Sequence, residues 1–232
     1  MMKSVRILAA AGAPVALAAL LAGPALAKSP KVSVRVEGKS RTLLQTKTVR
    51  TPSKGSIVKG GAAKGSCPAA GTAAGALNTA TRGKWKGTVS QGLGIEVTSI
   101  LGETDTFNAG HWWEFFVNDH PSTRGICSTR VKPGQRLLFA AVSSKAKAEF
   151  PIQLRVPSKT TVGTPFVVKA FYFPGASNKT KPMAGVKLTG VKGTTNAKGV
   201  ATVTATRPGK LSIVGSKRNE IRSAAARVSV AK

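Results

Sequence analysis

The start of the chain alternates apolar and polar residues in the manner of a half-buried β-strand. Val32, Val34 and Val36 occupy every second position of residues 31–37, so they share one face. A second extended stretch at residues 41–51 follows closely, which predicts a hairpin. A glycine-rich run then breaks the pattern and predicts a loop up to the first cysteine.

One segment beyond this loop is rich in helix-forming residues. Residues 69–81 (AAGTAAGALNTAT) predict a short helix that packs through Ala74, Leu77 and Ala80, although two glycines lower its helix propensity. Its small residues suit a close approach to a sheet. The pattern then returns to strands, at residues 84–91, 94–101, 112–118 and 136–142.

A polar and basic stretch at residues 142–150 separates these elements from a second β-rich region. Six short β-rich runs with no helical pattern follow it, at residues 152–156, 165–173, 185–191, 199–206, 210–216 and 225–230. We therefore expect a mainly β chain. An α+β domain with one short helix is predicted at 28–145, and an immunoglobulin-like β-sandwich at 150–232.

The first 27 residues have the pattern of an export signal. Lys3 and Arg6 precede an apolar run at residues 7–22, and the Ala-x-Ala sequence that ends at Ala27 fits a cleavage site. The run is shorter than the roughly 20 residues that a spanning helix needs. We expect a signal peptide at 1–27, a secreted mature chain that begins at Lys28, and no membrane span.

The chain is strongly basic, with 36 Lys and Arg against 8 Asp and Glu and a net charge of +28. The charge is spread over both halves. Such a surface attracts polyanions in a salt-dependent way, so anionic cell-wall or cell-surface polymers are the expected partners. The alternative is that the charge reflects the proteome of the source. No specific nucleic-acid partner is expected, because aromatic residues are 5% of the chain and the basic residues follow no recognisable motif.

Cys67 and Cys127 are the two cysteines of the sequence. Exported compartments are oxidising, so we expect them to form a disulfide. The alternative is a reactive thiol, which would need an activating partner that the sequence does not supply.

Catalytic chemistry has little support in the sequence. His111 and His120 are the two histidines, and both flank an aromatic strand close to Glu114 and Asp119. A metal or proton-transfer site could be built from these four residues, but adjacent strand positions alternate between faces. No phosphate loop, C-x-x-C or H-E-x-x-H motif is present. We expect a non-enzyme without a cofactor or a metal.

The densest aromatic cluster lies between the histidines, at Trp112, Trp113, Phe115 and Phe116. One face of this strand must pack into the core. The other face either presents an exposed aromatic side chain that stacks on a sugar or apolar ligand, or is covered by loops or by the second domain. The candidate ligand-binding residues are Trp112, Trp113, Phe115 and Asn118, and the pair that follows the strand, Asn118-Asp119, predicts a hairpin turn.

Residues 31–142 contain, in order, KVSVRVEG, a loop cysteine before an Ala-rich helix, GIEVTSILGE, HWWEFFVND, a second cysteine and VKPGQRLLF. This order resembles the transcobalamin-like C-terminal domain family. The resemblance implies a β-grasp-like fold, in which a sheet wraps around one helix. Such domains occur in exported bacterial proteins and in animal corrinoid carriers, where the domain covers one face of the vitamin beside a helical barrel.

The second region resembles the bacterial immunoglobulin-like domains of adhesins and cell-surface proteins, through residues 184–216 (AGVKLTGVKGTTNAKGVATVTATRPGKLSIVGS). The resemblance implies a spacer or adhesive module. We therefore predict a secreted, non-catalytic binding or surface-associated protein that its charge holds near anionic polymers. The alternative is a soluble protein that binds a small corrinoid-like or glycan ligand through the aromatic hairpin at 111–119.

Overall fold

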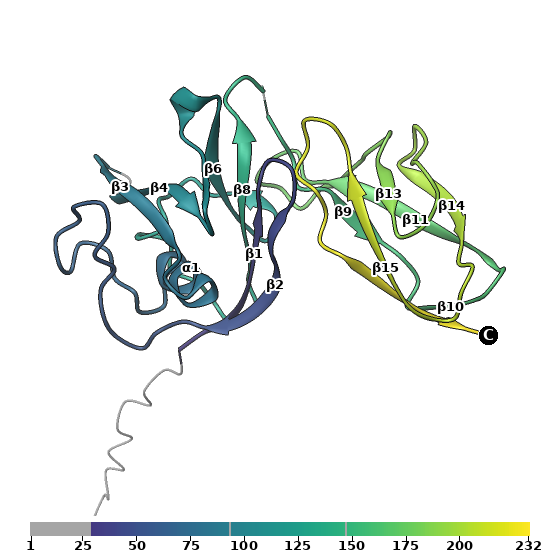
Figure 1. Cartoon of the computed structure of the whole chain (residues 1–232), viewed down its shortest axis with the longest axis horizontal. Coiled ribbons are helices and arrows are strands. Elements are labelled where there is room, and N and C mark those ends of the chain that lie inside the picture. The colour runs from purple at the N-terminus through teal and green to yellow at the C-terminus, as the bar shows by residue number, and fades with distance from the viewer. Residues whose placement is uncertain (1–28, 93, 147) are drawn as a thin grey trace, which may run out of the picture.

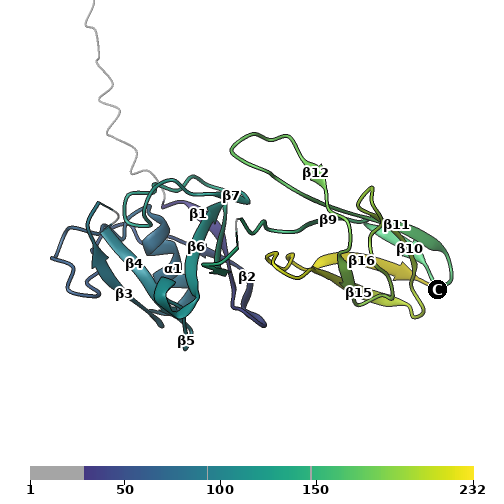
Figure 2. The same cartoon turned by 90° about the horizontal axis from the view of Figure 1, so that it is seen from above.

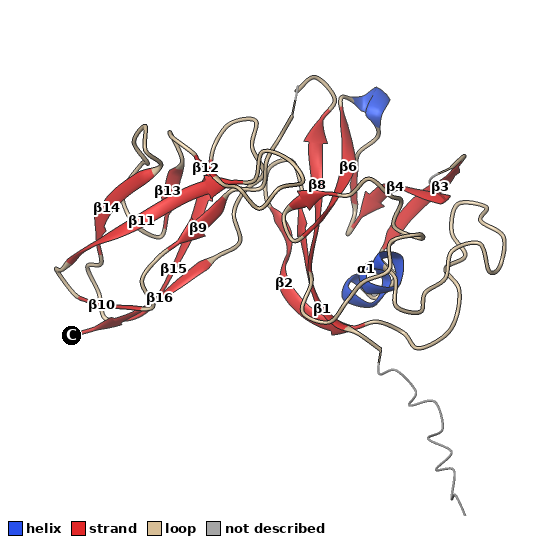
Figure 3. Cartoon of the chain, turned by 180° about the vertical axis from the view of Figure 1, so that it is seen from behind, coloured by secondary structure: helices blue, strands red, loops and turns tan. Residues whose placement is uncertain are grey.

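The computed structural model describes residues 29–92, 94–146 and 148–232, and the predicted export signal lies outside these residues. The described chain is mainly β, as the sequence predicts, and α1 is its one α-helix (Figures 1 and 3). Two β-rich parts lie side by side (Figure 2). The N-terminal part precedes residues 145–150, and the C-terminal part follows them. The exact domain limits stay a prediction. No helix within the described ranges is long and apolar enough to span a bilayer.

The larger sheet of the N-terminal part has the order β2-β1-β8-β6-β7. Its central pair, β1 (Lys31–Glu37) and β8 (Arg136–Ser143), is parallel. The outer strands β2 (Thr42–Arg50) and β6 (His111–Val117) are antiparallel to their neighbours, and β7 (His120–Pro121) closes a hairpin with the end of β6. A parallel central pair with hairpins on both sides is the β-grasp-like arrangement expected from the sequence.

The helix α1 (Ala73–Thr81) lies against one face of this sheet, next to β1 and β2 (Figure 1). Thr72 caps it, because its Oγ1 accepts a hydrogen bond from the Gly75 N–H at 3.1 Å. The glycine at position 75 is required by packing, since a Cβ there would overlap the carbonyl oxygen of Ala69. The side chains predicted to pack, Ala74, Leu77 and Ala80, are all buried.

A smaller antiparallel sheet of β3 (Trp85–Ser90), β4 (Gly94–Ile100) and β5 (Glu103–Thr104) follows α1, and a short 3-10 helix at Phe107–Ala109 comes after it. Trp85 of β3 donates to Asn78 of the helix at 3.0 Å. The disulfide between Cys67 and Cys127 is present, as predicted. It joins the loop before α1 to the loop after β7. Both sulfurs belong to the same buried cluster as the helix.

The C-terminal part is a β-sandwich, as predicted. One sheet has the order β10-β16-β15-β13, and the other has the order β12-β11-β14 with β9 also paired to β11. Val168, Ile213 and Val228 lie between the sheets with relative exposures of 0 to 1%. The strands are β9 (Gln153–Arg155), β10 (Lys159–Thr161), β11 (Pro165–Tyr172), β12 (Lys181–Pro182), β13 (Lys187–Thr189), β14 (Val200–Thr204), β15 (Gly209–Ser216) and β16 (Ala226–Ala231).

The two parts share a small apolar cluster. Phe116, Leu138, Ala140 and Val142, on the outer face of the larger sheet, pack with Ile221 from the loop before β16. The sequence predicts a half-buried β1, but this strand is buried on both faces, because the C-terminal part covers Arg35 and Glu37 as well.

Candidate functional site

Most acidic residues of the protein are buried or half-buried. Among the described residues, Glu96 is the only exposed carboxylate. Most lysine and arginine side chains are exposed, on both parts of the molecule. The buried or half-buried acidic residues are Glu37, Glu103, Asp105, Glu114, Asp119, Glu149 and Glu220.

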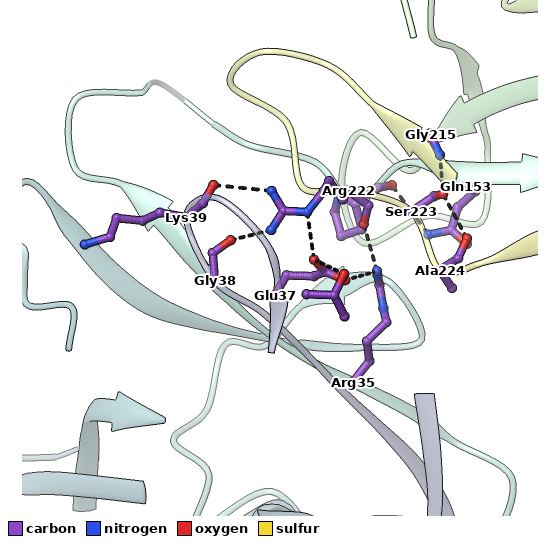
Figure 4. Close-up of polar contacts among 11 residues, drawn as sticks. Arg35, Glu37, Gly38, Lys39, Gln153, Gly215, Arg222, Ser223 and Ala224 are labelled. Carbon is purple, nitrogen blue, oxygen red and sulfur yellow. Dashed lines mark hydrogen bonds and ion pairs between the residues drawn. The ribbon is translucent and has the colours of Figure 1, made fainter. Parts of the chain in front are cut away.

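The Glu37 carboxylate is the centre of a polar network between the two parts (Figure 4). Its Oε1 accepts from Arg35 Nη1 at 2.8 Å, and its Oε2 accepts from Arg222 Nε at 3.1 Å. Thr42 Oγ1 donates to the same carboxylate at 3.0 Å. Arg222 also donates to the carbonyl oxygens of Gly38 and Lys39. Burial lowers the pKa of Arg35, and the charge of Glu37 opposes this change.

The other half-buried or buried carboxylates, apart from Glu114, also have partners within the protein. Asp105 pairs with Lys39 at 2.9 Å, and this hydrogen bond raises the pKa of the Lys39 ammonium. Asp119 pairs with Arg136 at 2.6 Å. Glu103 accepts a hydrogen bond from the Lys39 main-chain N–H. Glu149 accepts one from the Ser143 N–H, and Glu220 accepts one from the Phe150 N–H. These carboxylates are therefore engaged within the protein, although Glu103, Glu149 and Glu220 remain partly exposed.

A basic cluster lies on the outer face of the β9-β11 pair. Arg155 and Lys169 are direct cross-strand partners, and Lys198 lies beside them around a hollow of about 210 Å³. The Arg155 guanidinium carbon is 5.6 Å from the centre of the Phe171 ring, a cation–π contact. Like charges directly opposite one another repel, so an anion bound here would relieve the repulsion.

A cleft of about 650 Å³ separates the two parts. Its walls carry both signs of charge, including Lys39, Lys187 and Arg218 but also Glu149 and Glu220. The two carboxylates accept main-chain hydrogen bonds within the protein. This cleft is therefore less strongly cationic than the outer surface.

The aromatic strand β6 presents no exposed aromatic side chain. Trp113 and Phe115 are buried in the N-terminal core, and the Phe115 ring stacks on Phe139 with 5.1 Å between ring centres. On the other face Phe116 is buried and Trp112 half-buried, both in the cluster that includes Ile221 of the C-terminal part. Of the two alternatives open in the sequence, the structure has the one in which both faces are covered.

The turn predicted at Asn118 and Asp119 is present, and both residues adopt left-handed backbone angles. The Asn118 side chain accepts from the Arg136 N–H at 2.9 Å, so it holds the hairpin against β8. His120 Nδ1 lies 2.7 Å from the Gly175 carbonyl oxygen, in the C-terminal part. Among the described residues no three His, Cys, Asp or Glu side chains are grouped closely enough to hold a metal ion, so His111, Glu114, Asp119 and His120 do not form such a group.

A cavity of about 270 Å³ lies beside β6, between it and β4. Trp113, Phe115, Ile95, Val97 and Phe139 line its apolar wall. The Trp113 indole Nε1 is buried and has no hydrogen-bond partner among the described residues. The sequence analysis includes Trp113 and Phe115 as ligand candidates but misses Ile95 and Val97, although these two alternate with the exposed Glu96.

Comparisons with known proteins give no family. No family model matches the chain, and no curated protein matches it. Among solved structures, a protein from Ruminococcus gnavus described as a "putative metal binding protein" has a TM-score of 0.35 and 12% identity, over 49% of this chain and 97% of that one. A likeness of this size supports no functional argument. The resemblances to transcobalamin-like and immunoglobulin-like domains stay predictions.

Proposed function

We propose that this chain is an exported, non-catalytic protein that adheres to anionic cell-wall or cell-surface polymers through its cationic surface. The observation that carries the proposal is the position of the carboxylates. Glu96 is the one exposed acidic residue of the described chain, whereas lysine and arginine side chains cover both parts. The export signal predicted at residues 1–27 supports the compartment in which such polymers occur.

The sequestration of acidic groups strengthens the adhesion expected from net charge alone. A protein with mixed surface charges presents local patches of both signs, and a polyanion is repelled by the negative ones. Here almost all of the exposed charged side chains are lysine or arginine. Attraction of this kind is long-ranged and is screened by salt, with a Debye length of about 8 Å at physiological ionic strength.

A retention assay on isolated cell walls tests this function. The purified mature chain is added to walls with and without their anionic polymers, at low and at high salt. We expect retention that requires the anionic polymers and decreases steeply with salt, because exposed charges are screened. Equal retention at low and high salt, or on both kinds of wall, would contradict the proposal. An unrelated monomeric protein of mixed surface charge serves as the control.

A further inference from the structure

We propose that the open edge of β14 binds an acidic, extended segment of another protein as an additional β-strand. This inference goes beyond adhesion to polymers, because it requires hydrogen bonds to a polypeptide main chain. Figures 1 and 3 show β14 at the outer edge of the C-terminal part, away from the N-terminal part. Three observations support the proposal: the free main-chain groups of the strand, the absence of edge protection and the charge of the surroundings.

The main-chain groups on one side of β14 have no partner strand. β11 pairs with β14 in antiparallel register, and no other strand of the described chain pairs with β14. In this register the Ala170 N–H donates to the Gly199 carbonyl oxygen at 2.7 Å, so the main-chain carbonyl of Gly199 faces β11. Main-chain groups alternate between the two sides of a strand. Those of Thr202 and Thr204 therefore point to the open edge.

The open edge also lacks the features that usually prevent strand addition. Edge strands of monomeric proteins commonly carry a charged residue, a proline or a β-bulge. β14 has the sequence VATVT, and its register with β11 runs without a bulge. Thr202 and Thr204 are exposed, and both threonine and valine favour an extended backbone. The edge is thus suited to pairing with an incoming strand.

The surroundings of this edge are cationic. A hollow of about 910 Å³ lies between β14, the end of β13 and the start of β15, and Thr202 and Thr204 belong to its lining. The charged residues of the lining are Lys192, Arg207 and Lys210, all of them exposed, and none of the lining residues is acidic. An acidic strand would be attracted by these side chains, whereas a basic strand would be repelled.

The same charges disfavour a second copy of this chain as the partner. Antiparallel pairing of two β14 strands about Thr202 would bring Lys198 of one copy close to Arg207 of the other. Both side chains are exposed and positive, and the whole chain carries a net charge of +28. Like charges opposite one another repel, and a symmetric pair contains this contact twice. The occupant is therefore an acidic segment of a different protein.

The probe is the peptide acetyl-EETVTVTEE-amide, which combines a β-forming centre with acidic ends. Its control has the same sequence with the central Thr and Val main-chain N–H groups methylated, so it keeps the charge but loses those donors. Binding to the full mature chain is followed by ¹H–¹⁵N NMR and by amide hydrogen exchange. We expect the peptide to shift the Thr202 and Thr204 amide signals in a saturable manner and to slow their exchange. The methylated control should bind about tenfold more weakly. Equal binding of the two peptides, or no saturable shift, would overturn the proposal.

Two matched variants test the position of the site. Thr202→Pro removes the outward N–H of β14 and keeps the hydrogen bonds to β11, so the peptide should bind about tenfold more weakly. Val167→Pro makes the same substitution at the direct partner of Thr202 on β11, whose main-chain groups face the opposite edge of the sheet, and should bind as the wild type does. Equal weakening in both variants would contradict a site at β14. If Thr202→Pro does not fold, the exchange measurement on the wild type decides.

Other occupants of the edge give different results. Polyphosphate should leave the exchange of Thr202 and Thr204 unchanged, and a slowing equal to that caused by the peptide would instead assign the hollow to polyanions in general. Slow exchange that increases with protein concentration in the absence of peptide would assign the edge to a second copy. Either result would overturn the proposal. Thr202→Pro keeps the net charge, so its retention on anionic cell walls should equal that of the wild type. Peptide binding and wall retention can therefore fail independently.

Discussion

The Arg222 guanidinium donates through Nε to the Glu37 carboxylate at 3.1 Å, although 185 positions of sequence separate the two residues. The same carboxylate accepts from Arg35, and the Glu37 side chain is 2% exposed. Buried charges are stable only when each has a partner. Glu37 therefore pairs with two guanidinium groups at once and holds the loop before β16 against β1.

Replacement of Glu37 is expected to destabilise the protein strongly. Glu37→Gln leaves Arg35 buried without its counter-charge, which should lower the free energy of unfolding by about 3 to 5 kcal/mol. Denaturant unfolding followed by circular dichroism measures the change. Glu96→Gln is the matched control, because Glu96 is exposed and its replacement should cost less than about 0.5 kcal/mol. Equal losses in the two variants would show that the network contributes nothing.

Loss of the disulfide should also be costly. Cys67 and Cys127 enclose a loop with a sequence separation of 60 that contains α1. In the chain-entropy model, closing a loop of this length stabilises the fold by about 4 kcal/mol. The double variant Cys67→Ser/Cys127→Ser should unfold at correspondingly lower denaturant, and reduction of the wild type should have the same effect. A stability unchanged by reductant would contradict this expectation.

Much of the fold follows from local sequence pattern. The alternating valines of β1 and the alanines of α1 predict these elements and their buried faces, because a period of two or of about 3.6 residues directly records which face is covered. The two-residue strands β7 and β12 could not be predicted in this way, because two residues are too few to show a period. The local pattern also does not predict that the second face of β1 is buried. Arg35 and Glu37 are polar, and they are covered because they bind Arg222 from a distant part of the chain.

Glu114 should make stability depend on pH. Burial, with a smaller contribution from the charge of Glu149, raises the pKa of Glu114 from 4.5 to about 6. The native state therefore retains this proton when the unfolded state has lost it, and the free energy of unfolding decreases as pH rises from about 4.5 through 6. Allowing for partial solvent screening, the decrease should be about 1 kcal/mol.

The Glu114→Gln variant isolates this effect. Unfolding curves of the wild type and the variant are compared at pH 4.5 and pH 7, and the difference in stability between them should move in favour of the variant at the higher pH. Glu96→Gln should show no such trend. A difference that stays constant with pH would mean that Glu114 titrates alike in the folded and unfolded states.

The basic cluster on the β9-β11 pair should contribute more to adhesion than its charge alone. Changing Arg155, Lys169 and Lys198 to glutamine should weaken polyphosphate binding severalfold and reduce the salt slope by about 2. The control variant changes three exposed residues of the N-terminal part, Lys54, Lys64 and Arg82, to glutamine and removes the same charge. If both variants lose the same affinity, net charge acts without a preferred site.

The candidate sites could be predicted only in part. Net charge is additive along the sequence, so a basic surface follows from composition, but the inward position of nearly every carboxylate depends on tertiary pairing. The aromatic strand is equally visible in the sequence. Whether Trp113 is exposed or covered depends on β4, which is separated from β6 by a turn, β5 and a 3-10 helix.

The inward carboxylates also make the surface charge nearly independent of acidity. Ordinary surface carboxylates lose or gain charge below about pH 5, whereas lysine and arginine side chains titrate above about pH 10. A surface whose exposed ionisable groups are almost all of the second kind therefore also keeps its charge below about pH 5. An acidifying culture or host compartment would then leave the attraction to strongly acidic polymers unchanged, and ionic strength alone would control release.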